Sequence, residues 1–195
     1  MEIIMKKIFI VAFILCIAQV SYAQLFAGGQ IGFNRTSVTD QAGNETKSNG
    51  WTLAPELGYH LNERLDIGLG VEYSYVKNDA GPIEVATFAI APFARFMAIE
   101  FGNLSIHIRG DIYYANQNDK ENDETTNAFG LRIAPLAQYK LSDSFSLVAT
   151  LNFASLGFEI TSGEGDSKST SFGFGADSGN VMNTNDFQIG FIYNF

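Results

Sequence analysis

Apolar and polar residues alternate with a period of two along most of the chain after residue 24, and this pattern constrains the fold more than any other feature. In one segment, large apolar residues occupy the odd positions and small or polar residues occupy the even positions. The odd positions hold Leu65, Ile67, Leu69, Val71, Tyr73 and Tyr75, and the even positions hold Asp66, Gly68, Gly70, Glu72 and Ser74. The alternation returns after Leu104 and between Phe187 and Phe195. Because successive side chains of a strand point to opposite faces, the pattern predicts β-strands with one apolar and one polar face.

Turn residues divide this alternating sequence into eight expected strands. They cover residues 24–37, 49–61, 65–77, 84–99, 104–116, 126–141, 145–161 and 184–195. The connections near residues 62, 102 and 142 are short, whereas those at 38–48, 78–83, 117–125 and 162–183 are mostly longer and polar. Short periplasmic turns opposite longer external loops are typical of outer-membrane barrels. The even strand number then places both ends of the exported chain on the periplasmic side.

Six charged residues lie in the middle of the polar faces: Glu56, Glu72, Arg95, Arg109, Asp111 and Arg132. In a soluble barrel they would occupy the core, but in a membrane barrel the polar face lines the interior. We expect one group of Glu72, Asp111 and Arg132, and a second group of Glu56, Arg95 and Arg109 nearer the periplasm. Aromatic residues near the strand ends suit the two membrane interfaces: Trp51, Tyr59, Tyr73, Tyr75, Tyr139 and Tyr193. The sequence therefore predicts an all-β, eight-stranded, antiparallel, up-and-down transmembrane β-barrel.

An Ala-Pro dipeptide recurs at matched positions in three strands, within residues 54–59, 91–96 and 134–139. Proline cannot donate a ladder hydrogen bond, so we expect a bulge or a broken ladder bond near one rim of the barrel. Glycines on the inward faces are expected to leave room for long Arg and Glu side chains, or else to bend the strands: Gly28, Gly32, Gly58, Gly68, Gly70, Gly130 and Gly190.

The first 23 residues have the features of a cleaved signal peptide. Lys6 and Lys7 precede an apolar run from Ile8 to Ala18, which is too short to span a membrane well. Glu2 is unusual in such a segment, so Met5 is an alternative start. The only cysteine, Cys16, lacks the small preceding residues of a lipidated cysteine, although lipidation is the alternative interpretation of this segment.

We predict cleavage between Ala23 and Gln24, because Ser21 and Ala23 supply the small residues that the processing enzyme requires. Residues 24–195 would form the mature barrel domain. N-terminal sequencing or intact mass measurement of the purified protein tests this prediction. A mature chain that retains Cys16 with the added mass of a lipid would contradict it.

The chain ends on aromatic residues at alternate positions, with Phe191, Tyr193 and a terminal Phe195. This ending resembles the assembly signal of bacterial outer-membrane barrels. Together with the signal peptide, the alternation and the loop lengths, it makes residues 24–195 resemble the small outer-membrane-protein β-barrel family of the OmpA and OmpX type. The resemblance implies an integral protein of the bacterial outer membrane, with its long loops outside, inserted by the outer-membrane barrel insertion machinery.

The sequence favours a non-enzymatic protein with a structural or surface-interaction role. The alternatives are a narrow channel or small hydrophobic-ligand carrier, and a surface enzyme that modifies lipid A. The only histidines are His60 and His107, and both are expected toward the periplasm. His107 could act as a general base oriented by the carboxylate of Asp111, but no motif supplies a serine nucleophile.

No cofactor or metal is expected. The exported chain would contain no cysteine, and the acids between Asp119 and Glu124 do not match a calcium loop. Loss of Glu2, Lys6 and Lys7 would change the net charge from −9 to −10. A chain this acidic is not expected to bind nucleic acid, because nucleic-acid binding requires basic residues that neutralise phosphates. The expected partner is the lipid bilayer, the chain is expected to be a monomer, and the sequence identifies no ligand of the outer loops.

Overall fold

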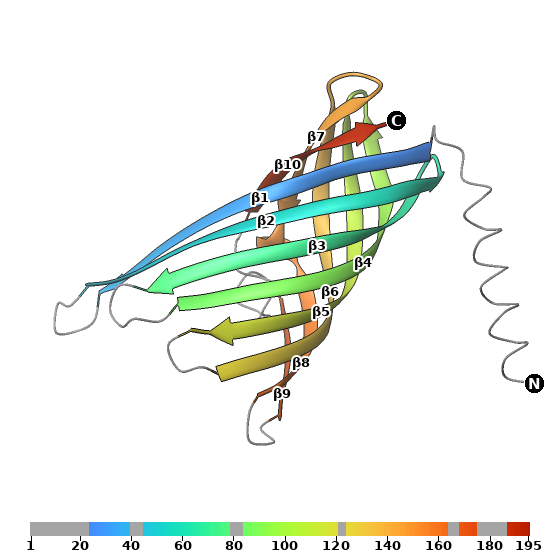
Figure 1. Cartoon of the computed structure of the whole chain (residues 1–195). Helices are drawn as coiled ribbons and strands as arrows, with labels where there is room; N and C mark the ends of the chain where they lie inside the picture. Colours follow the sequence, from blue (N-terminus) through green and yellow to red (C-terminus); the bar gives the residue numbers. More distant parts are fainter. Residues whose placement is uncertain (1–23, 40–44, 79–83, 121–123, 164–167, 175–186) are drawn as a thin grey trace, which may run out of the picture.

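The computed structural model describes residues 24–39, 45–78, 84–120, 124–163, 168–174 and 187–195 (Figure 1). The predicted signal peptide, including Ala23, lies outside these residues. The structure is built from strands: β1 (Leu25–Thr39), β2 (Glu45–Asn62), β3 (Leu65–Asn78), β4 (Glu84–Phe101), β5 (Leu104–Asp119), β6 (Glu124–Lys140), β7 (Phe145–Leu151), β8 (Leu156–Ser162), β9 (Lys168–Phe174) and β10 (Phe187–Asn194). A short 3-10 helix, η2 (Asn152–Ala154), separates β7 from β8. Among the described residues, no helix is long and apolar enough to cross a membrane.

These strands form a closed antiparallel barrel of eight strands. Strands β1 to β6 pair in sequence order, and β10 pairs with both β1 and β7 to close the wall (Figure 1). Strands β7 and β8 both pair with β6, so they are two halves of the seventh strand. Strands β9 and β10 pair with β8 and β7 and occupy the eighth. The fold predicted from the alternation is therefore confirmed.

The structure differs from the sequence prediction at the outer ends of the strands. Strands β1 and β2 stay paired as far as Thr39 and Glu45, inside the expected loop 38–48. Strand β9 lies within the expected loop 162–183. The strands extend into the expected loops because backbone N–H and C=O groups form the ladder hydrogen bonds, and these groups pair equally well in segments of polar residues. At about 3.3 Å per residue, strands of this length exceed a hydrocarbon core of roughly 30 Å even when tilted.

The two faces of the wall have the predicted chemistry. Large apolar side chains point outward and stay about half exposed, for example Leu69, Ile112 and Phe129. The residues between them point inward and are mostly buried. In a membrane, lipid would cover these outward side chains, so they need no apolar protein partner.

The Ala-Pro dipeptides coincide with interruptions of the ladder, as predicted. Pairing of β2 with β3 skips Ala54 and Pro55, and pairing of β4 with β5 skips Ala91 and Pro92. At Ala134 and Pro135, β6 changes its partner from β8 to β7. The interruptions lie near the middle of these long strands and not near a rim, so the predicted depth was wrong. The strands extend farther beyond the prolines than the sequence pattern indicated.

We predict that the short turns face the periplasm and the longer loops face outward. Because Cys16 is the only cysteine, Asn62→Cys, Asn103→Cys and Lys120→Cys would each carry a single thiol after signal cleavage. A membrane-impermeant maleimide applied to intact cells should label position 120 and leave positions 62 and 103 unlabelled. Lysed cells provide the control that all three thiols are reactive. Labelling at 62 with none at 120 would reverse the orientation.

Candidate functional site

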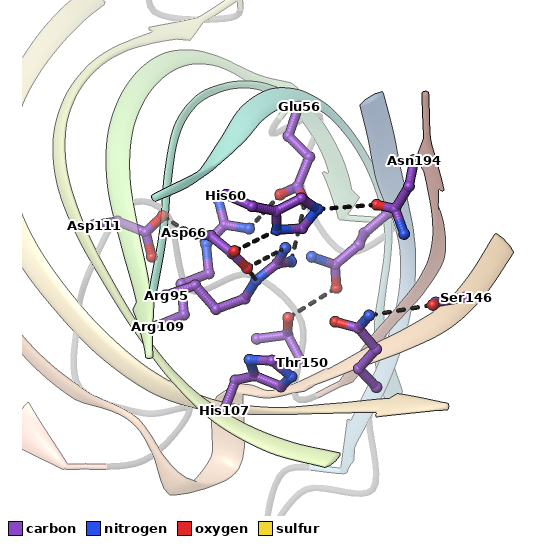
Figure 2. Close-up of polar contacts among 12 residues, drawn as sticks. Glu56, His60, Asp66, Arg95, His107, Arg109, Asp111, Ser146, Thr150 and Asn194 are labelled. Atoms are coloured by element: carbon purple, nitrogen blue, oxygen red, sulfur yellow. Dashed lines mark hydrogen bonds and ion pairs between the residues drawn. The ribbon is translucent and has the colours of Figure 1, made fainter. Parts of the chain in front are cut away.

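The barrel interior contains all six charged residues that the sequence analysis selected. Each is at most 6% exposed, and Asp111 is 0% exposed. Their inward direction follows from the alternation, since each occupies the polar column of β2, β3, β4, β5 or β6. Figure 2 shows the labelled side chains converging from the wall toward the centre of the barrel. Charges inside so narrow a space are desolvated, so their partners decide whether the interior is stable.

Asp111 lies between two arginines. Its Oδ1 accepts a hydrogen bond from Arg109 Nε at 2.9 Å, and its Oδ2 lies 3.3 Å from Arg132 Nη2. Arg109 also donates through Nη1 to Glu56, and Glu56 lies 3.5 Å from Arg95 Nη1. Five of the six expected residues are therefore joined into one chain of ion pairs through the Arg109 side chain (Figure 2). Glu72, expected in the group of Asp111 and Arg132, is not part of this chain.

The chain of ion pairs continues to the periplasmic end through two residues that the sequence analysis did not select. Arg95 Nη2 lies 2.9 Å from Asp66 Oδ2, and Asp66 Oδ1 lies 2.5 Å from His60 Nδ1. His60 Nε2 in turn lies 3.1 Å from Asn194 Oδ1 on the last strand. The alternation placed Asp66 on the polar face, but it did not show which residues lie opposite it. The strand register sets Asp66 opposite Arg95 on β4.

Glu72 and Glu159 occupy the outer part of the described interior. Glu72 is buried and lines a small central cavity together with Glu56, Arg109 and Arg132. Glu159, which the sequence analysis missed, is fully buried and accepts a hydrogen bond from Tyr113 Oη at 2.7 Å. Its inward direction was visible in the alternation of Leu156, Phe158 and Ile160 on the opposite face.

Apolar side chains close the interior nearer the periplasm. A buried cluster is formed by Phe26, Phe93, Leu136, Val148 and Ile192. The guanidinium of Arg95 lies 4.8 Å from the Phe26 ring centre, and that of Arg109 lies 4.0 Å from the Phe93 ring centre. Such cation–π contacts stabilise buried arginines beyond their ion pairs. The interior is therefore a layered mixture of ion pairs and aromatic rings, where the sequence pattern predicted polar residues alone.

Three inward glycines make room for rings and not for Arg or Glu side chains. A Cβ atom added at Gly58, Gly68 or Gly130 would overlap the rings of Phe26, Phe93 and Tyr113, respectively. Among the inward glycines for which the surroundings of an added Cβ atom are described, only Gly70 has a guanidinium beside it, that of Arg109. The expectation that the inward glycines leave room for Arg and Glu side chains is therefore wrong for Gly58, Gly68 and Gly130, which make room for aromatic rings, and agrees with the structure at Gly70.

The histidines do not form the arrangement considered for catalysis. Asp111 is bonded to Arg109 and Arg132, so it does not orient His107. His107 Nε2 instead lies 2.8 Å from Ser105 Oγ, and within the described part of the chain no hydrogen-bond partner is present at its Nδ1. A serine–histidine pair without an orienting acid lacks one element of the usual hydrolytic triad. The described residues also contain no group of three or more His, Cys, Asp or Glu suited to a metal ion.

The C-terminal aromatic residues lie on the outward face of the closing strand. Phe191, Tyr193 and Phe195 are each about half exposed or more. The backbone N–H of Phe195 donates to Leu25 O at 3.1 Å, so the last residue is joined to the first strand. Gln24, the residue predicted to follow the cleavage site, is exposed and accepts a hydrogen bond from the Tyr59 hydroxyl.

The fold and its polar interior define an integral β-barrel protein of the bacterial outer membrane. The sequence matches the family model of the outer membrane protein beta-barrel domain over residues 8–195, and the chain belongs to this family. The resemblance seen in the sequence is thus confirmed.

The chain also matches solved structures from several sources. Neisserial surface protein A is 13% identical, with a TM-score of 0.47, and the match covers 89% of this chain and 97% of that one. A major outer membrane protein from Thermus thermophilus is 16% identical, with a TM-score of 0.42 and coverages of 88% and 99%. A de novo designed transmembrane β-barrel is 11% identical, with a TM-score of 0.36 and coverages of 89% and 96%. Comparison with curated protein sequences found no match.

Proposed function

We propose that this protein is a non-enzymatic component of the outer membrane with a closed interior, whose role is structural or lies in interactions at the cell surface. The observation that carries the proposal is the continuous chain of ion pairs from Arg132 through Asp111, Arg109, Glu56, Arg95 and Asp66 to His60. Eight-stranded barrels are just wide enough for side chains to fill them. A chain of paired charges along that interior leaves little space for solutes.

The size of the central cavity supports this proposal over transport. The cavity beside Glu56, Glu72 and Arg132 has a volume of about 20 Å³, which is roughly the space of one water molecule. Small-molecule sites usually occupy several hundred Å³. A larger apolar hollow beside Gly29 and Pro55 lies on the outward wall, where acyl chains of the bilayer would fill it. The central cavity therefore does not support the channel and ligand-carrier alternatives. A hollow of about 190 Å³ beside His60, Asp66 and His107 lies at the end of the barrel with the short turns.

The chemistry of the interior disfavours the enzymatic alternative. Both histidines lie at the end of the barrel with the short turns, far along the strands from the outer leaflet where lipid A resides. The buried carboxylates of Glu56 and Asp111 form ion pairs with arginines.

We further propose that the barrel is a monomer in contact with bilayer lipid, and that the outer-membrane insertion machinery assembles it.

Two measurements on cells and vesicles test the proposed function together. Lipid A from cells that express the protein should have the same mass spectrum as lipid A from cells with an empty vector. Vesicles that contain the purified barrel should swell in sugar solutions no faster than protein-free vesicles. A new lipid A species would establish an enzyme, and rapid swelling would establish a channel; either result contradicts the proposal.

A further inference from the structure

The hollow at the end of the barrel with the short turns is called here the rim hollow. It has a volume of about 190 Å³, and His60, Asp66 and His107 line it from β2, β3 and β5. Figure 2 shows these three side chains directed from the wall toward the centre of the barrel. Since one water molecule takes up about 30 Å³, the rim hollow has room for a ligand of a few non-hydrogen atoms.

A buried hydrogen-bond acceptor without a donor lies in the wall of the rim hollow, at His107. Ser105 Oγ donates to Gln138 O at 3.5 Å and lies 2.8 Å from His107 Nε2, so the hydroxyl oxygen accepts a hydrogen bond from Nε2–H. This assignment leaves Nδ1 of the neutral ring as an acceptor. The His107 side chain is 6% exposed, and Nδ1 has no hydrogen-bond partner among the described residues.

A second acceptor of the same kind belongs to Gln138, which also lines the rim hollow. Its Nε2 donates to Ser146 Oγ at 3.1 Å, which fixes the amide with Oε1 as the acceptor. This Oε1 is buried and, like His107 Nδ1, has no partner in the described part of the chain. A buried acceptor without a donor is costly, so two of them beside one hollow indicate a ligand that donates hydrogen bonds.

The charges at this end of the barrel favour a cationic ligand. The described short turns and the adjoining strand ends contain four acids and two cations: Glu63, Asp66, Glu100 and Asp143 against Arg64 and Lys140. Acids stay in excess even if His60, which is bonded to Asp66, carries a positive charge. Arg95 lies deeper and is paired with Glu56 as well as with Asp66. An excess of acids raises the local concentration of small cations.

We infer that the rim hollow is a binding site for a small primary ammonium ion. An ammonium group has three N–H donors and no acceptor, whereas an amide or a carboxylic acid would bring an acceptor of its own. Because His107 Nδ1 and Gln138 Oε1 are shielded from solvent, binding includes a small rotation of both side chains toward the hollow. This inference goes beyond the proposed function, since a ligand at one end leaves the interior beyond it closed.

Titration of the detergent-solubilised mature protein with ethylammonium tests the site, followed by nitrogen NMR of isotope-labelled histidine. His60 and His107 are the only histidines, so few ring signals are present. The signal of His107 Nδ1 should shift as this atom accepts a hydrogen bond. Half-saturation is expected at about millimolar concentration, because a ligand of three non-hydrogen atoms gains little binding energy. Ethanol, which is neutral, and tetramethylammonium, which has no N–H, should cause no comparable shift.

A Gln138→Leu variant removes one acceptor and keeps His107 as the reporter. Half-saturation should then need at least about tenfold more ethylammonium, which is the effect of one hydrogen bond to a charged group. Asn116→Ala is the matched control, because it removes an amide from the opposite end of β5, and it should respond like the parent. Heat-modifiable gel migration establishes that both variants are folded.

A phosphatidylethanolamine headgroup carries the same ammonium group as a free amine. Micelles doped with short-chain phosphatidylethanolamine, compared with phosphatidylcholine, test that source, and a His107 shift with either the lipid or ethylammonium supports the site. A response to neither would overturn the inference, since water alone would then occupy the rim hollow. An equal response to ethanol or to tetramethylammonium would also overturn it, as would a parental response in Gln138→Leu.

Discussion

In an Asp111→Asn variant, the free energy of unfolding should fall by about 3–5 kcal/mol, because two buried guanidiniums lose the carboxylate between them. Asp111 is fully buried and bonded to Arg109 at 2.9 Å and to Arg132 at 3.3 Å. Asparagine keeps the size of the side chain, so the loss reports charge and not packing. Urea unfolding from lipid vesicles measures the change.

Two further variants test whether the loss of stability in Asp111→Asn comes from its buried ion pairs. Asp143→Asn removes an exposed partner of Lys140 and should leave the unfolding free energy unchanged within error, as exposed pairs contribute little. Arg132→Met should be less destabilising than Asp111→Asn, since Asp111 keeps its closer bond to Arg109. Parent-like stability in Asp111→Asn would show that the interior charges are solvated and that the chain of ion pairs contributes little.

Deletion of Phe195 should prevent most of the chain from inserting into the outer membrane. The terminal aromatic residue resembles the recognised end of such barrels, and its backbone N–H also joins the closing strand to Leu25. Its ring centre lies 5.3 Å from that of Tyr193. The fraction of heat-modifiable protein in purified outer membranes measures assembly.

A Phe195→Tyr variant is the matched control, because it keeps an aromatic ring and the backbone bond to Leu25. It should assemble at close to the parental level. If the deletion variant reached the membrane in normal amounts with normal heat-modifiable migration, Phe195 would not be part of an assembly signal.

The alternation of residue types was enough to predict the strands other than β9 and the direction of most interior side chains. A period of two is a local property, so it gave the inward direction of Glu56, Arg109 and Asp111 without knowledge of any contact. It did not give their depth, because strand tilt and register shift neighbouring strands along one another. The structure contains two such register shifts near the short turns, at His60–Asn62 and at Met97–Ile99.

Other features depend on contacts between distant segments and were beyond a local pattern. Asp66 joins the chain of ion pairs because the strand register sets it opposite Arg95 on β4 and opposite His60 on β2. The apolar cluster of Phe26 and Phe93 requires glycines on neighbouring strands opposite each ring. Strand β9 was missed because its Ser, Thr and Gly residues have the composition of a loop, yet its backbone pairs with β8 throughout.

Planar-bilayer recording of the purified mature protein tests the closed interior most directly. The parent should carry no steady ionic current, because paired charges and aromatic rings fill the interior. An Arg95→Ala/Arg109→Ala variant, which shortens the two side chains that link these layers, should conduct, provided that heat-modifiable migration shows it to be folded. A steady, ohmic current through the parent would contradict the account, since the chain of ion pairs would then line a pore instead of closing it.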